Sequence, residues 1–325
     1  MTSRVVEITT KGSSVKVPAL EIDGHTIVVT GRWMKVAAIH DEEWIDDGLP
    51  DIHACVTKLK QHDAGDVRAD IFTFAQKLPA TAPLYSYLMD WESVAAIHLG
   101  SYEDWWNHAI SGDARKDVRR AGKRGVRVEV VEFDDDLVKG IVEIYNEAPI
   151  RQGKAFWHYG KGFELVRREK ATFRDRSVFL GAYYERELIG FTKIVYVRKT
   201  AAMMQVIAKT SHYDKRPVNA LIAKAVQHCA AQGMAFLTYG RYRNRNKGIS
   251  SLTRFKHRLG FEEILVPKFY VPLTAKGRMW LALGLHRDPL TVLPEWTIDG
   301  LYRVRTVWSR WRTRGRRSGD PGQRD

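Results

Sequence analysis

One stretch limits the possible folds of this chain more than any other, namely residues 212–233, HYDKRPVNALIAKAVQHCAAQG. Its apolar residues recur at the spacing of one helical face, while Pro217 suits the first turn of a helix and Gly233 suits its end. Strand signals lie on both sides, AAMMQVIAKT before the helix and AFLTYG after it. Residues 201–240 therefore predict a strand–helix–strand unit with a right-handed crossover. The apolar face comprises Val218, Leu221, Ile222, Ala225, Val226 and Cys229.

The segments around this unit complete a mixed α/β domain. SVFLGAYYE and LIGFTKIVYVR, joined by Arg186 and Glu187, predict an antiparallel strand pair before it. ISSLTRFKHRL at 249–259 predicts a short helix, which leads into a last strand, FEEILVPKFYVPL. Farther upstream we expect a helix at 135–148, followed by a loop over the polar and aromatic run IRQGKAFWHYGKGF.

The first part of the chain mixes strands with one helix. We expect residues 1–16 to be a frayed lead-in, His25–Ile39 to form two short strands about Gly31, and residues 50–61 to be helical. ADIFTFAQKLP and LYSYLMDWESVAAIHLG carry further strand signals. DARKDVRRAGKRGVRVEVVE, residues 113–132, predicts a basic helix, then a strand, and marks a domain boundary.

The length favours two domains, because 325 residues are many for one compact domain. We expect an N-terminal domain at 1–112 and a second domain at 113–275. A basic segment rich in Arg and Trp follows at 276–325, and its last eight residues are expected to be disordered.

The charge of the chain indicates an anionic partner. Lys and Arg number 52 against 38 Asp and Glu, for a formal net charge of +14, which favours nucleic acid, phosphorylated metabolites or anionic lipid. Residues 301–317, LYRVRTVWSRWRTRGRR, suit either a peripheral contact with an anionic membrane or nonspecific RNA binding. The basic helix near 113–124 either follows a phosphate backbone or is a solvated linker. Its cations are Arg115, Lys116, Arg119, Arg120, Lys123 and Arg124.

Cysteine usage and hydropathy bear on the compartment. Cys55 and Cys229 are far apart in sequence, so neither a disulfide framework nor a metal cluster is indicated. The N-terminus lacks the apolar core of a secretory signal, and no apolar run reaches the roughly 18 residues of a membrane span. We expect a cytoplasmic protein, peripheral at most to the inner membrane surface, with no permanently bound cofactor and no metal site.

Three motifs carry a resemblance to a known family. RKDVRRAGKRGVRVE, RPVNALIAKAVQHCAAQGMAFLTYG and LTRFKHRLGF running into PKFYVPLT resemble the GNAT acyltransferase superfamily. Within it, they are most similar to the Fem-type aminoacyltransferases that build peptidoglycan cross-bridges, and to related acetyltransferase-like proteins. The resemblance covers residues 110–275 and implies a mostly antiparallel sheet flanked by helices. The first 110 residues would be a degenerate companion half.

The resemblance implies an N-acyltransferase with either acyl-CoA or aminoacyl-tRNA as co-substrate. The acceptor would be an amine of a sugar, or of a nucleotide-activated or lipid-linked precursor of the cell envelope or of a polysaccharide. A noncatalytic GNAT-like module that binds anionic membrane or RNA is the alternative outside the enzyme class. The oligomeric state is left open.

The chain departs from the family at the position of the donor phosphate. Acetyl-CoA enzymes of this fold carry a Gln/Arg-x-x-Gly-x-Gly/Ala turn, in which glycines let backbone N–H groups approach the pyrophosphate. Here the run is Lys215-Arg216-Pro217-Val218-Asn219-Ala220, without glycine. An anion at this turn would be held by the side chains of Lys215, Arg216 and Asn219.

The remaining candidate residues have proposed chemical roles. The resemblance places Lys256 near the reacting carbonyl, where it would stabilise an oxyanion, and Tyr239 would return a proton to the leaving group. Glu147 or His158 would deprotonate the attacking amine. Each of the four also has a structural interpretation, as a surface lysine, a core tyrosine or a bystander. The residues expected to contact the substrate are Arg151, Lys154, Trp157, Tyr159 and Arg241.

Overall fold

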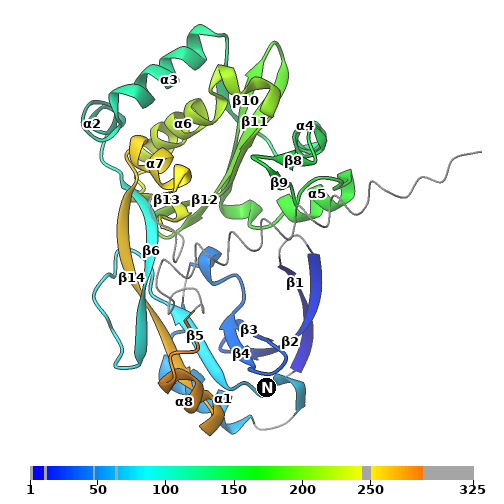
Figure 1. Cartoon of the computed structure of the whole chain (residues 1–325), viewed down its shortest axis with the longest axis vertical. Coiled ribbons are helices and arrows are strands. Elements are labelled where there is room, and N and C mark those ends of the chain that lie inside the picture. The colour runs from blue at the N-terminus through cyan, green and yellow to red at the C-terminus, as the bar shows by residue number, and fades with distance from the viewer. Residues whose placement is uncertain (1–2, 11–12, 47, 63–64, 244–249, 288–325) are drawn as a thin grey trace, which may run out of the picture.

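The computed structural model describes residues 3–287, apart from 11–12, 47, 63–64 and 244–249 (Figure 1). The predicted tail features at 301–317 and at the last eight residues lie outside this range. The N-terminal elements are β1 (Ser3–Thr10), β2 (Ser13–Ile22), β3 (His25–Thr30), β4 (Val36–Ile39), η1 (Glu42–Trp44), α1 (Ile52–Gln61), η2 (Gly65–Val67), β5 (Ile71–Ala75), β6 (Leu88–His98), α2 (Tyr102–Asp104), η3 (Trp105–Ala109) and α3 (Gly112–Lys123).

The C-terminal elements include a strand–helix–strand unit at the predicted place. They are β7 (Arg127–Val131), α4 (Asp135–Asn146), β8 (Ile150–Arg151), β9 (Lys154–Ala155), α5 (Phe163–Lys170), η4 (Arg174–Arg176), β10 (Ser177–Tyr184), β11 (Glu187–Val197), β12 (Thr200–Ala208), η5 (Thr210–Lys215), α6 (Pro217–Ala231), β13 (Phe236–Arg241), α7 (Ser251–Arg258), β14 (Glu262–Pro272) and α8 (Ala275–Ala282).

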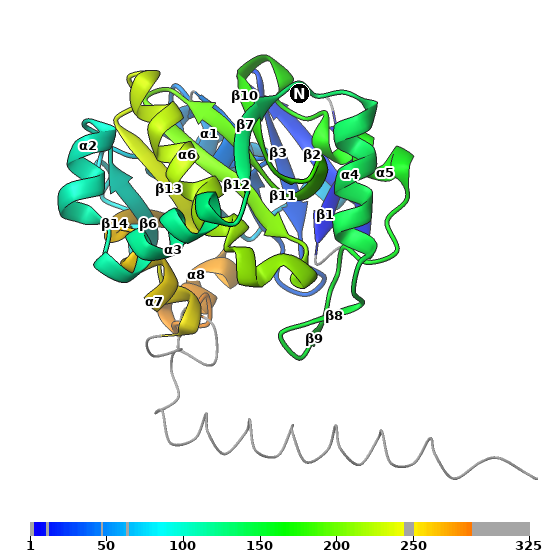
Figure 2. The ribbon, with the colours of Figure 1, turned by 90° about the horizontal axis from the view of Figure 1, so that it is seen from above.

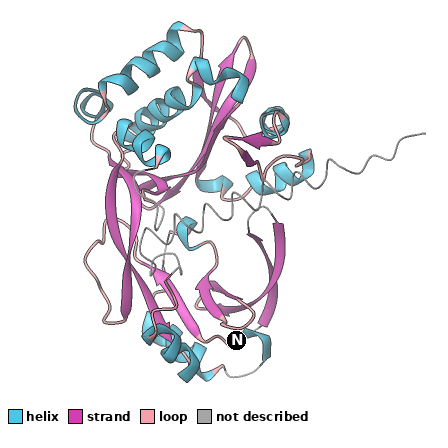
Figure 3. Cartoon of the chain, viewed as in Figure 1, coloured by secondary structure: helices cyan, strands magenta, loops and turns pink. Residues whose placement is uncertain are grey.

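A single twelve-stranded sheet runs through the molecule in the order β1-β2-β3-β4-β5-β14-β6-β13-β12-β11-β10-β7 (Figure 3). Two of its neighbouring pairs are parallel, β4 with β5 and β12 with β13, and the other pairs are antiparallel. In each parallel pair the chain crosses over through a helix, α1 in the N-terminal half and α6 in the C-terminal half. The predicted mixed, mostly antiparallel sheet flanked by helices is confirmed.

The two halves exchange their last strands. β6 follows β5 in sequence, yet it pairs with β13 of the C-terminal half, while β14 pairs with β5 of the N-terminal half. β6 and β14 also pair with each other along nine residues, Leu88 to Ala96 against Glu262 to Tyr270. Figure 1 shows these long strands running from one half into the other. A boundary at residue 112 is therefore crossed by continuous sheet pairing.

Two expectations for the chain path were wrong. Residues 1–16 are not a lead-in, because β1 and β2 pair as a hairpin from Ser3 opposite Leu20 to Thr10 opposite Ser13. The alternation of polar and apolar residues in SRVVEITT and SSVKVPALEI fits this pairing. The expected loop after α4 contains the small β8–β9 hairpin, with Arg151 opposite Lys154.

The C-terminal sheet carries helices on both faces (Figure 2). One core lies between the sheet and α6 and includes Leu180, Ile194 and Leu221. The other lies under α4 and α5 and includes Ile141 and Phe191. The α4 face of the sheet is the one that turns toward η1 and the strands of the N-terminal half, and it positions the candidate site.

Candidate functional site

The parallel strands β12 and β13 pair over only three positions, Thr200–Ala202 opposite Phe236–Thr238. β12 continues to Ala208 and β13 to Arg241 without further pairing between them. The open edge of a strand presents backbone N–H and C=O groups to a ligand. This separation, with α6 starting just beyond β12, forms the centre of the candidate site.

A groove of about 810 Å³ lies beside this separation, between the two halves. We call it the central groove. One wall comes from β12 and from the segments around α5, and the opposite wall comes from β3, β4 and η1. Its lining includes Phe156, Trp157, His158, Lys170, Gln205 and Tyr239 from the C-terminal half, and His40, Asp41 and Trp44 from the N-terminal half.

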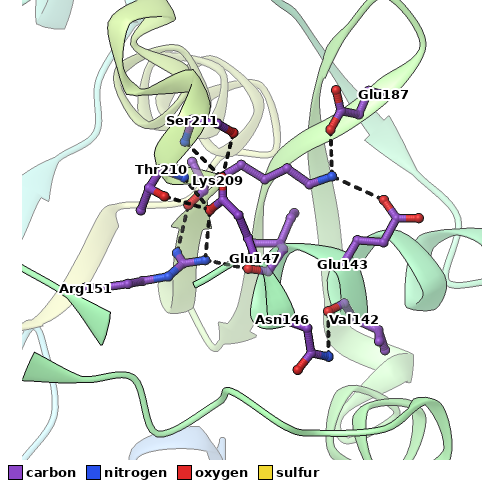
Figure 4. Close-up of polar contacts among 11 residues, drawn as sticks. Val142, Glu143, Asn146, Glu147, Arg151, Glu187, Lys209, Thr210 and Ser211 are labelled. Atoms are coloured by element: carbon purple, nitrogen blue, oxygen red, sulfur yellow. Dashed lines mark hydrogen bonds and ion pairs between the residues drawn. The ribbon is translucent and has the colours of Figure 1, made fainter. Parts of the chain in front are cut away.

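Glu147 anchors the turn between β12 and α6 (Figure 4). Its carboxylate accepts hydrogen bonds from Thr210 N at 2.6 Å and Oγ1 at 3.0 Å, and from Ser211 N at 2.9 Å and Oγ at 2.6 Å. Burial opposes its ionisation, but the bonds from Ser211 and Thr210 outweigh burial and lower the pKa of Glu147 to about 2. A general base works best with a pKa near the operating pH. This geometry therefore favours an anchoring role for Glu147 over the predicted base role.

Other side chains of the same turn are also paired. The Lys209 ammonium donates to Glu187 at 2.6 Å and to Glu143 at 3.2 Å (Figure 4). Arg151 donates to the Ala208 carbonyl at 2.8 Å and also to the Ile144 carbonyl. Arg151, expected to contact the substrate, thus ties the end of α4 to the end of β12.

The three predicted phosphate ligands lie at the start of α6. Lys215 forms an ion pair with Asp214 at 3.6 Å and lies over the Tyr184 ring at 4.7 Å. Arg216 has the left-handed φ of 58° and pairs with Asp117 of α3 at 3.2 Å. Asn219 is buried in the first turn. Ion pairs already engage both cations, and Pro217 supplies no N–H.

The aromatic loop divides into exposed and buried members. Lys154 on β9 and Tyr159 are exposed, and Trp157 is 55% exposed although it lines the central groove. His158 is only 3% exposed, and its Nε2 lies 2.8 Å from Gln205 Nε2. Burial, together with the charges of Lys161, Lys170 and Arg151, lowers the pKa of His158 to about 3, so its imidazole is neutral at neutral pH.

Lys256 and Tyr239 meet at the end of β13. Lys256 is 3% exposed, and its ammonium donates to the carbonyl oxygens of Tyr239 at 2.5 Å and Arg241 at 2.7 Å. Burial lowers the pKa of Lys256 to about 8 and raises that of Tyr239 to about 12. Lys256 thus holds the backbone at the end of β13 through these two hydrogen bonds. Of the two residues, Tyr239 lines the central groove and Lys256 does not. Arg241 pairs with Glu92 at 2.7 Å.

A second cavity, of about 400 Å³, adjoins the paired part of β12 and β13. We call it the Glu42 cavity. It is lined by Ala202, Thr238 and Gly240 of these strands and by Glu42 and Glu43 of η1, among others. Burial raises the pKa of Glu42 to about 7, although its carboxylate accepts a hydrogen bond from Ala75 N at 2.9 Å. No pattern in the sequence pointed to Glu42, because its place depends on how the two halves meet.

In the part of the chain that the structure describes, no three His, Cys, Asp or Glu side chains gather closely enough to hold a metal ion. No helix in those residues is both long and apolar enough to cross a membrane.

Comparison with known proteins agrees with this architecture. A family model described as an acetyltransferase (GNAT) domain matches residues 112–256. No curated protein matches the chain with significant sequence similarity.

Several solved structures share the fold at low sequence identity. The C-terminal domain of a putative lysylphosphatidylglycerol synthetase from Agrobacterium fabrum has a TM-score of 0.54 and 15% identity, over 81% of this chain and 86% of that one. FemX has a TM-score of 0.54 and 10% identity, over 86% and 90%. L-PGS from Bacillus licheniformis has a TM-score of 0.51 and 16% identity, over 79% and 84%.

Proposed function

We propose that this chain is an acyltransferase that transfers an acyl or aminoacyl group to an amine, because its residues 112–256 match the model of an acetyltransferase (GNAT) domain. The proposed acceptor is a sugar, or a nucleotide-activated or lipid-linked precursor of the cell envelope or of a polysaccharide. Support for the envelope comes from the fold shared with FemX and with a protein named as a lysylphosphatidylglycerol synthetase.

One observation carries the proposal, namely that β12 and β13 separate beside two ligand-sized spaces, the Glu42 cavity and the central groove. A donor carbonyl held at the separation can be approached by an amine from either space. The amine nitrogen would attack the carbonyl carbon, so that a C–N bond forms while the C–O or C–S bond to the donor breaks. Holding both reactants there supplies proximity, which is a large part of catalysis in such transfers.

Glu42 is our proposed general base. Its carboxylate lines the Glu42 cavity opposite Thr238 and Gly240, and its pKa of about 7 suits proton removal from an amine near neutral pH. Tyr239 stays protonated at that pH and is our proposed proton donor to the leaving oxygen or sulfur.

Enzymes with this domain use acyl-CoA as co-substrate, but the turn before α6 favours a different donor here. The Glu147 carboxylate takes the amides of Thr210 and Ser211, so a negative charge already lies on this turn. The cations of Lys215 and Arg216 are paired with carboxylates. We therefore propose aminoacyl-tRNA as the donor, with acyl-CoA as the second candidate. The phosphates of a tRNA would suit the exposed cations of α3, which are Lys116, Arg119, Arg120 and Lys123.

Binding measurements on the full chain separate the two donors. We expect filter binding to show retention of aminoacylated tRNA, with an affinity that falls steeply and linearly with the logarithm of the salt concentration. Calorimetry with acetyl-CoA should give no heat of binding. Stoichiometric acetyl-CoA binding that Lys215→Ala and Arg216→Ala both weaken would overturn the tRNA assignment and establish CoA.

The noncatalytic alternative makes a different prediction. If the chain only binds anionic membrane or RNA, binding should survive substitution of the groove residues Tyr239 and Gln205. It should then disappear when residues 301–325 are removed. This alternative would be excluded if Glu42→Gln abolished the transfer activity while removal of residues 301–325 left it unchanged.

A further inference from the structure

The imidazole of His158 is held rigidly in the wall of the central groove. Its ring stacks on Tyr145 with a centroid distance of 4.3 Å and an interplanar angle of 22°, and it lies 3.7 Å from the Trp157 ring. Tyr145 is fully buried, and Gln205 contacts the ring edge from β12. The orientation of the imidazole is therefore set by residues of several elements.

The hydrogen bonds of Gln205 determine which His158 nitrogen carries the proton. Gln205 Oε1 accepts from Tyr145 OH at 2.6 Å and from the Lys170 ammonium at 2.5 Å. An ammonium can only donate, so the amide oxygen must face Lys170 and the amide nitrogen must face His158. Gln205 Nε2 is itself a donor, and it lies 2.8 Å from His158 Nε2. Nε2 therefore accepts, and the proton of the neutral ring is on Nδ1.

This Nδ1–H donor has no acceptor among the residues that the structure describes, although the atom is buried. A buried donor without a partner costs about 1–3 kcal/mol. Native proteins rarely leave such a group unpaired, and an exception calls for a functional explanation. Because His158 lines the central groove, an oxygen of a bound molecule is the partner that this position can receive.

The charges around His158 favour an anionic oxygen. Lys161, Lys170 and Arg151 all act on the ring as cations, and the Lys161 charge is offset by its ion pair with Glu169 at 2.6 Å. Lys170 lies in the groove lining, where an ammonium has three donors and Gln205 Oε1 takes one of them. The Lys170 ammonium thus keeps further donors in the same groove lining as His158.

We propose that His158 Nδ1–H and the Lys170 ammonium form a binding site for a carboxylate or phosphate group in the central groove. Lys170 fixes the orientation of the Gln205 amide, and this amide fixes the tautomer of His158. His158 is then a hydrogen-bond donor to the ligand and not a base. The site itself follows from the geometry alone. The assignment of the bound anion to the amine acceptor rests on the proposed function.

The test is nuclear magnetic resonance of the full chain labelled with 15N in its histidines. Spectra that correlate ring nitrogens with ring protons distinguish the two tautomers, and His158→Phe identifies the signals while keeping an aromatic ring. We expect the proton on Nδ1 throughout the neutral pH range. Inorganic phosphate and acetate, added separately at constant ionic strength, should shift the Nδ1 signal saturably. The signals of His108, which is 76% exposed, serve as the reference for general salt effects.

Gln205→Glu is the matched variant, because it keeps the shape of the side chain and reverses the hydrogen bond. A carboxylate opposite Nε2 requires a donor there, so the Nε2 signal should move to that of a protonated nitrogen. A proton on Nε2 in the unsubstituted chain would overturn the proposal, and so would an Nδ1 signal that neither anion moves. The experiment uses no acyl donor, so its failure is distinguishable from failure of the proposed transfer reaction.

Discussion

The proposed reaction depends on the ionisation state of Glu42. A base must be unprotonated to act, so with a pKa of about 7 the transfer rate should rise with pH through that value and then level off. Glu42→Gln should lower the plateau by roughly 10² to 10⁴-fold and remove the rise. The measurement is a pH–rate profile with any amine acceptor that supports turnover.

Glu43→Gln is the control for this prediction, because it removes the same charge from the same cavity and leaves Glu42 in place. Its profile should keep the rise near pH 7. If Glu42→Gln retained the full rate and the same profile, another group would have to be the base.

At the scale of residues, the sequence indicated which side chains would cluster but not what they contact. Tyr239, Trp157 and His158 were expected at the site, and all three line the central groove. Lys256 and Arg151 were assigned to the reaction and the substrate, yet they donate to main-chain carbonyls. Such partners come from segments far away in sequence, so residue type and spacing do not reveal them.

At the scale of elements, Glu147 joins the end of α4 to the turn between β12 and α6. Its pKa in the folded chain, about 2, lies below the ordinary value of 4.5. Its ionised form therefore stabilises the fold fully above about pH 4.5, and this contribution is lost as the pH falls toward 2. The difference corresponds to about 3 kcal/mol at neutral pH.

We expect Glu147→Gln to lower the free energy of unfolding by up to about 3 kcal/mol at pH 7. At pH 3 this loss should be smaller by about 2 kcal/mol, because the carboxyl group of the unfolded chain is then largely protonated. Urea unfolding of both chains at several pH values measures this difference. Glu164→Gln, on the α5 surface, is a control that should show no comparable loss. A Glu147→Gln penalty that is equal at pH 3 and pH 7 would show that the carboxylate charge is not the cause.

The elements themselves were largely predictable, because most of them bury one face and carry a regular apolar pattern. The apolar period of α6, the stop at Gly233 and the alternation of β7 gave elements at the expected positions. The β8–β9 hairpin was missed because two-residue strands carry no period. β1 and β2 were missed because Gly12, Ser13 and Ser14 are typical of a turn and interrupt the strand pattern of this segment.

At the scale of the whole molecule, the exchange of β6 and β14 makes each half depend on the other. The segment that matches the GNAT family model, residues 112–256, contains β12, α6 and β13 but neither exchanged strand. It also lacks Trp105, which is 2% exposed in the core beside α6 and donates from Nε1 to the Leu259 carbonyl at 3.0 Å. The sequence could not reveal this exchange, because each strand has the same apolar pattern whichever half it joins.

We therefore expect residues 112–256, expressed alone, not to fold cooperatively. Without β6 the outer edge of β13 has no strand partner, and an exposed edge of this kind promotes aggregation. Urea unfolding followed by circular dichroism should show a broad transition, with binding of an apolar dye to exposed core residues. Residues 1–287 are the control and should unfold in one sharp transition, because they contain every described strand. A cooperative, monomeric fragment of 112–256 would show that the exchanged strands join two independent domains, and the central groove would then be free to open between them.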